Sequence, residues 1–80
     1  MPKYVIGTTK NGSETVTIGY FTHREMARTA GIESVLSAGH CDIDDAGNVL
    51  RVYGKSYGFG IESKESDKTI LQEFLSKKRV

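Results

Sequence analysis

Two aromatic residues in the second half of the chain have the spacing of a base-stacking surface. Tyr57 and Phe59 are two residues apart, and Lys55 precedes them by two. Alternate side chains of a strand share one face, so both rings and the lysine would lie on the same side of a sheet. Exposed rings stack with nucleic-acid bases, and nearby cations contact phosphate groups. The pattern predicts a site for single-stranded RNA made of four residues: Lys55, Tyr57, Phe59 and Arg51.

The segment around these rings, residues 55–61, resembles the RNP1 motif of RNA-recognition motifs and cold-shock domains. The lysine, both aromatics and the glycine between them match, whereas Ser56 replaces a glycine and Gly60 replaces a buried valine. The resemblance implies that bases stack on the two rings, with the lysine near phosphate. The competing interpretation is a core strand in which Phe59 faces inward. We favour packing, because Val52 offers Phe59 a natural core partner.

A second nucleic-acid motif is suggested by residues 26–32, where a small residue and a glycine follow a short helix as in a helix-turn-helix. The segment that would read DNA, residues 33–38, contains one acidic residue and no basic one. Base edges in the major groove are read by arginine, lysine, asparagine or glutamine side chains. We therefore interpret residues 22–38 as a kinked packing helix and keep a DNA-binding regulator as the weaker alternative.

Residues that could support catalysis or metal binding are few. His40 and Cys41 are adjacent, so on a strand they point to opposite faces and cannot act together as base and nucleophile. His23 and His40 alone are too few to make a metal site. The aspartate-rich segment 42–48 lacks the oxygen ligands that a calcium loop needs at its fifth and twelfth positions. We expect no enzyme activity, no metal and no cofactor, with Cys41 acting as a small buried hydrophobe.

Composition places the chain among small globular domains. Its 80 residues are 38% hydrophobic and 26% charged, and the formal net charge of +1 does not predict strong attraction to a polyanion. The single cysteine cannot form the internal disulfides on which small secreted domains usually depend. The apolar run near the N-terminus is too short for a signal peptide or membrane span. We expect one domain over residues 1–80, in the cytoplasm and without a membrane partner.

The elements that position these residues begin with a hairpin. Residues 3–9 and 15–20 are rich in β-branched and aromatic side chains, and the Asn-Gly pair at 11–12 is typical of a two-residue turn. That turn would pair Val5 with Ile18 and leave apolar residues on both faces of the hairpin. Such a hairpin is either covered on two sides or lies against a partner.

Two helices are expected. Thr22 and Glu25 have the spacing of a capping box, so a helix begins there and runs, with a kink or break at Gly31, to residue 38. Ser66 or Asp67 is expected to cap the second helix. Its apolar residues recur at helical spacing: Ile70, Leu71, Phe74 and Leu75.

Three short strands are expected between the helices, at residues 41–44, 49–53 and 57–62, with turns between them. If these strands form antiparallel hairpins, one face of them becomes continuous and apolar. That face would carry Cys41, Ile43, Leu50, Val52, Phe59 and Ile61. The order β-β-α-β-β-β-α predicts a small α+β fold, with a mainly antiparallel sheet and two helices packed on it.

These observations favour a small non-catalytic accessory protein, of a kind common among mobile-element genes, that binds another macromolecule through its surface. Near-neutral charge and the apolar residues on both faces of the first hairpin make a protein the expected partner. We expect the contact surface to include Tyr4, Ile6 and Tyr53, and the same surface would serve a homo-oligomer joined through a sheet edge. Binding of single-stranded RNA by residues 55–61 is the alternative.

Overall fold

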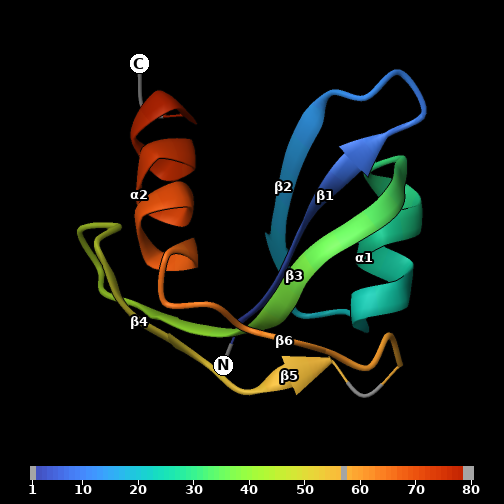
Figure 1. Ribbon diagram of the computed structural model, residues 1–80. Helices are drawn as coiled ribbons and strands as arrows, with labels where there is room; N and C mark the ends of the chain where they lie inside the picture. Colours follow the sequence, from blue (N-terminus) through green and yellow to red (C-terminus); the bar gives the residue numbers. More distant parts are fainter. Residues whose placement is uncertain (1, 57, 79–80) are drawn as a thin grey trace.

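Four antiparallel strands form the middle layer of the molecule, in the order β2-β1-β3-β4 (Figure 1). The computed structural model describes residues 2–56 and 58–78. The strands of the sheet are β1 (Lys3–Thr9), β2 (Glu14–Gly19), β3 (Ile32–Ile43) and β4 (Val49–Tyr53). The other elements are two helices and a two-stranded ribbon: α1 (His23–Thr29), α2 (Asp67–Lys78), β5 (Lys55–Ser56) and β6 (Ile61–Glu62). The predicted α+β class, with a mainly antiparallel sheet and two helices packed on it, is confirmed.

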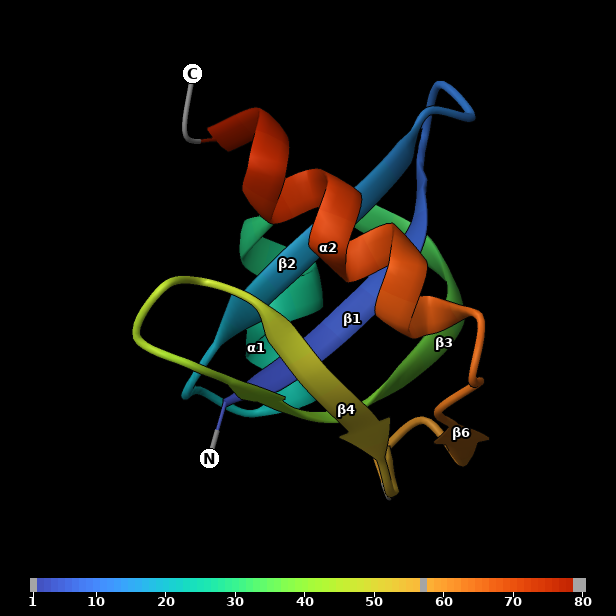
Figure 2. The ribbon, with the colours of Figure 1, turned by 90° about the vertical axis from the view of Figure 1, so that its left-hand side faces the viewer.

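The two helices cover opposite faces of the sheet. Figure 2 shows α2 lying across β1 and β2, and α1 lies behind the sheet in the same view. The α2 side has a core of Tyr4, Ile6, Cys41, Val49 and Leu71, and the α1 side has a core of Val5, Met26, Ala27 and Ala38. Alternate residues of β1 thus enter both cores, as the pleat of a strand requires. The prediction that both faces of the first hairpin could be covered is therefore confirmed.

The turn between β1 and β2 closes over three residues, 10–12, instead of the Asn-Gly pair alone. Gly12 has a φ of 81°, whereas no residue other than glycine in the described chain has a positive φ. A two-residue turn of the predicted type needs two positive φ angles. The additional residue moves the pairing by one position, so Val5 pairs with Thr17 and not with Ile18. Because such a shift exchanges the faces of a strand, Ile18 lies on the α2 side.

The first helix begins as predicted and ends earlier. The Thr22 hydroxyl accepts a hydrogen bond from the backbone N–H of Glu25 at 3.2 Å, so the capping box is confirmed on the side of its threonine. The helix ends at Ala30, and Gly31 has a φ of 73°. A left-handed glycine is common just after the last residue of a helix, so Gly31 ends the helix here and does not merely kink it.

The segment predicted as the second half of that helix is a strand. Residues 32–43 form β3, which pairs with β1 along most of its length. Two register shifts against β1 leave Ile32, Val35 and Ala38 packed on the α1 side, at a spacing of three that imitates a helix. The prediction of a packing helix over residues 32–38 is therefore wrong. No second helix follows α1 in this segment, so the helix-turn-helix interpretation is wrong as well.

The expected apolar face around β4 is correct in part. Cys41 pairs with Val52, as predicted, but a register shift in the ladder pairs Ile43 with Val49. Val49 is therefore buried, while Leu50, which we expected to face inward, is 56% exposed. A single irregularity in the ladder thus exchanges an inward and an outward residue.

The segment after β4 forms one more strand than expected. Residues 55–62 fold back on themselves, so β5 and β6 pair with each other in a separate ribbon and not with β4. Phe59 lies in the turn of this ribbon and packs against the α1 side of the core. The predicted pairing of Phe59 with Val52 is therefore wrong, although its inward orientation is right.

The C-terminal helix matches its predicted apolar stripe. Leu71 of α2 is fully buried, and Ile70 and Leu75 pack beside it against the sheet. The helix begins at Asp67, next to the position at which a capping residue was expected. Within the described residues, neither helix has the length and apolar character needed to cross a membrane.

Candidate functional site

A buried carboxylate joins the start of α2 to the centre of the sheet. Asp67 is 2% exposed and accepts hydrogen bonds from the Tyr4 hydroxyl at 2.6 Å and the Ser37 hydroxyl at 2.9 Å. The backbone N–H of Lys64 donates to the same group at 2.9 Å. These donors offset the cost of burying a charge. Burial and the bond to Asp67 raise the pKa of Tyr4 far above its ordinary value, so its hydroxyl stays a donor at neutral pH.

Two of the residues predicted for the contact surface belong to this interior. Tyr4 is 0% exposed and Ile6 is 2% exposed. Both lie on β1, which has a strand on each side, and both point to the face that α2 covers. Neither side chain can touch a partner while the domain is folded, so this part of the prediction is wrong. The sequence shows that the face is apolar, but it does not show that the last helix returns to cover it.

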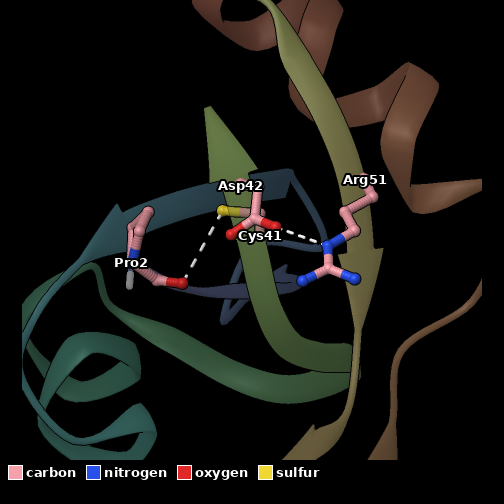
Figure 3. A network of polar contacts seen from close by, with 4 residues as sticks. All are labelled: Pro2, Cys41, Asp42 and Arg51. Atoms are coloured by element: carbon pink, nitrogen blue, oxygen red, sulfur yellow. Dashed lines mark hydrogen bonds and ion pairs between the residues drawn. The ribbon is translucent and has the colours of Figure 1, made fainter. Parts of the chain in front are cut away.

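Tyr53, the third predicted contact residue, is half-buried in a row of rings and cations. Its ring stacks on His40 with 5.6 Å between centroids, and the guanidinium carbon of Arg51 lies 4.5 Å from its centroid. Arg51 also forms an ion pair with Asp42 on the neighbouring strand (Figure 3). A cation–π contact at an exposed site contributes about 0.5–1 kcal/mol. Tyr53 and Arg51 therefore already contact one another and their own neighbours.

Cys41 lies beside this row and points inward. Its thiol is fully buried and donates to the backbone oxygen of Pro2 at 3.8 Å (Figure 3). Burial raises the pKa of Cys41 to about 11, so the thiol is protonated at neutral pH. The prediction that Cys41 behaves as a small buried hydrophobe is confirmed.

The four residues predicted to bind RNA do not share one open strand. Phe59 is partly buried against the α1 side of the core, and Arg51 is paired with Asp42. Lys55 lies on β5, which ends after two residues, and Tyr57 falls outside the described residues. The RNP1 resemblance implies a longer strand in an open sheet, and residues 58–60 form a turn instead. This segment therefore does not form the predicted base-stacking surface on a strand.

The most exposed aromatic side chains among the described residues lie where β2 leads into α1. Tyr20 is 74% exposed and Phe21 is 71% exposed. Phe21 immediately precedes the helix cap, a position from which an apolar residue often packs against Met26 at the fourth helical position. Phe21 and Met26 line the same groove, yet most of the Phe21 side chain remains in contact with solvent. Local capping alone does not account for this exposure.

A groove that Phe21 lines runs between the outer strand β2 and α1. Its lining includes residues 17–19 of β2 and the α1 residues Glu25, Met26 and Arg28. The strand is at the edge of the sheet, so the backbone groups on its outer side have no strand to pair with. An open strand edge, two exposed rings and a groove with one charge of each sign thus lie together.

Comparison with known proteins gives no relative from which to argue. The chain matches no protein-family model, and no similar protein was found among curated sequences or solved structures. A fold does not by itself define a function. The function must therefore be inferred from the groups that the protein exposes at its surface.

Proposed function

We propose that this protein is a small non-catalytic binding protein that receives an extended segment of another protein on the open edge of β2. The observation that supports this proposal is the pair of exposed rings, Tyr20 and Phe21, at the end of that strand. Single exposed apolar residues are common on protein surfaces and need no explanation. Here two consecutive aromatics lie at the end of an unpaired strand edge, next to a groove. Strand addition requires such an edge for backbone hydrogen bonds and a groove for side chains.

Strand addition uses the backbone for affinity and the side chains for specificity. The outer N–H and C=O groups of β2 would pair with the incoming segment, while alternate side chains of that segment would enter the groove beside Met26. Glu25 and Arg28 offer one charge of each sign along this groove. The fitting partner is therefore an extended segment with apolar residues at alternate positions and little net charge.

The two rings set the scale of the interaction. Full burial of an aromatic side chain removes about 150–250 Å² from water. Since roughly three-quarters of each residue is exposed, covering both would remove about 220–370 Å² and contribute about 5–9 kcal/mol before the costs of association. With a net charge of +1, the protein has little long-range attraction to add. Binding should therefore depend on these two side chains and respond weakly to salt.

The test combines capture with mapping of the contact. The wild-type protein and the double variant Tyr20→Ala/Phe21→Ala are used as bait in nuclease-treated lysate, and hydrogen exchange is then measured with the captured protein. Leu50→Ala is the matched control, because Leu50 is 56% exposed on the opposite edge strand. We expect the double variant to lose the partner, the control to retain it, and the β2 amides to gain protection. Equal capture by the double variant, or protection of β4 instead, would refute the proposal.

A second copy of this chain is an alternative occupant of the same edge. Two β2 edges would pair around a twofold axis, which is the commonest symmetry of small assemblies. Light scattering over a range of concentrations distinguishes the two occupants, because self-association raises the mass and Tyr20→Ala/Phe21→Ala lowers it again.

RNA binding by residues 55–61 stays a prediction with weaker support, because Phe59 packs into the core. The cytoplasmic location likewise stays a prediction.

A further inference from the structure

We propose that a second pocket, formed by α1, β1, β3 and the β5–β6 ribbon, binds a phosphate group. Its lining includes six side chains that carry the argument: Lys3, His23, Arg24, His40, Lys55 and Ser56. None of these residues lines the groove beside Phe21, so this pocket is separate from the surface proposed for the protein partner.

Cations from three different elements line this pocket. Lys3 belongs to β1, Arg24 to α1 and Lys55 to β5, so the fold gathers three positive charges in a protein whose net charge is only +1. No aspartate or glutamate is among the lining residues that the structure describes. Glu62 lies opposite Lys55 in the register of the β5–β6 ribbon, and it lines the neighbouring hollow and not this pocket. The pocket is therefore a locally positive site suited to an anion.

The hydroxyl of Ser56 supplies an independent reason to expect a ligand. Ser56 is 1% exposed, and its oxygen is the one buried side-chain polar atom in the described residues without a hydrogen-bond partner. Buried hydroxyls are almost always paired, because leaving one unpaired is unfavourable. A phosphate oxygen in this pocket would accept its hydrogen bond. Ser56 thus offers a donor that the protein itself does not use.

Two histidines complete the wall of the pocket. The Nε2 atom of His23 lies 2.8 Å from the backbone oxygen of Gly39, and its ring meets the ring of His40 edge to face with 5.6 Å between centroids. Burial, followed by the positive charges of His23 and Lys3, lowers the pKa of His40. A bound anion would oppose those charges. The pKa of His40 should therefore rise when phosphate binds, which provides a local readout.

The same rings indicate a compact ligand. His40 is stacked on Tyr53 with 24° between the ring planes, and His23 meets His40 edge to face. These contacts leave the rings engaged with each other, so the lining residues that the structure describes offer a nucleic-acid base no prepared stacking partner. The pocket volume of about 380 Å³ leaves room for a phosphate group with an organic substituent. We therefore assign inorganic phosphate or a small phosphate monoester, and not an RNA strand.

The first experiment titrates the protein with inorganic phosphate at constant ionic strength, with chloride as the reference anion. Amide chemical shifts, the His40 pKa and the melting temperature are recorded. We expect shifts at Arg24, His40 and Ser56, a higher His40 pKa and a higher melting temperature. Arg24→Gln should weaken phosphate binding by roughly tenfold, as expected for loss of a charge-assisted contact. Arg28→Gln, which changes another exposed arginine of α1 outside the pocket, should leave it within about twofold.

The Ser56→Ala variant separates a ligand-binding role from a structural one. Without phosphate, this variant should melt at the same or a higher temperature, because it removes an unpaired buried hydroxyl. With phosphate, most of the gain in melting temperature should disappear. The proposal is overturned if chloride stabilises as well as phosphate, if Arg28→Gln weakens binding as much as Arg24→Gln, or if Ser56→Ala keeps the full gain.

A final comparison identifies the source of the phosphate group. Inorganic phosphate and glycerol phosphate are titrated separately against the wild-type protein. Tighter binding of glycerol phosphate supports a monoester ligand, and equal or weaker binding supports free phosphate. A single-stranded RNA oligonucleotide that displaces phosphate at a concentration roughly 100-fold lower than either would overturn the assignment of a small ligand.

Discussion

Replacing Tyr4 by phenylalanine should show how much the buried carboxylate contributes to stability. The change removes one hydroxyl and leaves the ring, so the packing of the α2 side is kept. The lost bond to Asp67 is 2.6 Å long and fully buried, in the range of strong charge-assisted bonds. A hydrogen bond to a charged group contributes about 1.5–3 kcal/mol. Tyr4→Phe should therefore lower the free energy of unfolding by about 1.5–3 kcal/mol.

The same bond predicts a dependence on alkaline pH. The folded state raises the pKa of Tyr4 above its unfolded value of about 10, because burial and Asp67 disfavour the phenolate. The stability that this bond provides is complete below about pH 10 and is lost as the pH rises further. Between the wild type and Tyr4→Phe, the difference in unfolding free energy should shrink by about 1.36 kcal/mol for each pH unit above that value.

Urea unfolding followed by circular dichroism, at pH 7 and at intervals up to pH 11, measures both effects. Tyr20→Phe is the matched control, because Tyr20 is 74% exposed, and its stability should change by less than about 0.5 kcal/mol. Asp67→Asn adds a second check, since it keeps the shape of the side chain and weakens the bond from Tyr4. A loss below about 0.5 kcal/mol in Tyr4→Phe, or a difference that does not shrink above pH 10, would contradict this account of the core.

Three further predictions concern packing and the thiol. Leu71→Ala should lower the unfolding free energy by about 2–5 kcal/mol in urea titrations, because Leu71 is fully buried between α2 and the sheet. Gly39→Ala should lower the melting temperature markedly, since a Cβ atom there would lie 2.7 Å from the backbone oxygen of Tyr53. Gly19→Ala is the control and should be nearly neutral, because its Cβ atom would meet only Met26, at 3.8 Å. Cys41 should react with a thiol reagent at pH 8 only after denaturant is added, because burial raises its pKa to about 11, and rapid reaction of the folded protein would contradict its burial.

Features that depend on neighbours in the chain could be read from the sequence. The Thr22 cap, the helix break at Gly31 and the apolar stripe of α2 were all identified, because each depends on interactions within about four residues. The α+β class followed from the order of these local patterns. The single cysteine was likewise predicted to be an interior residue, because the sequence gives it no second cysteine and no base on the same face of its strand.

Other features were decided only by contacts between distant segments. The spacing of Ile32, Val35 and Ala38 suits a helix, and only the bulges against β1 make it a strand. The return of α2 buries Tyr4, while one additional turn residue reverses the faces of β2 and so places Ile18 on the α2 side. Register and coverage depend on pairing across the sheet, where a shift of one residue exchanges inside and outside. For that reason the sequence determined the local caps, breaks and apolar stripes and the class of the fold. The tertiary structure decided that residues 32–43 are a strand and which side chains a partner can reach.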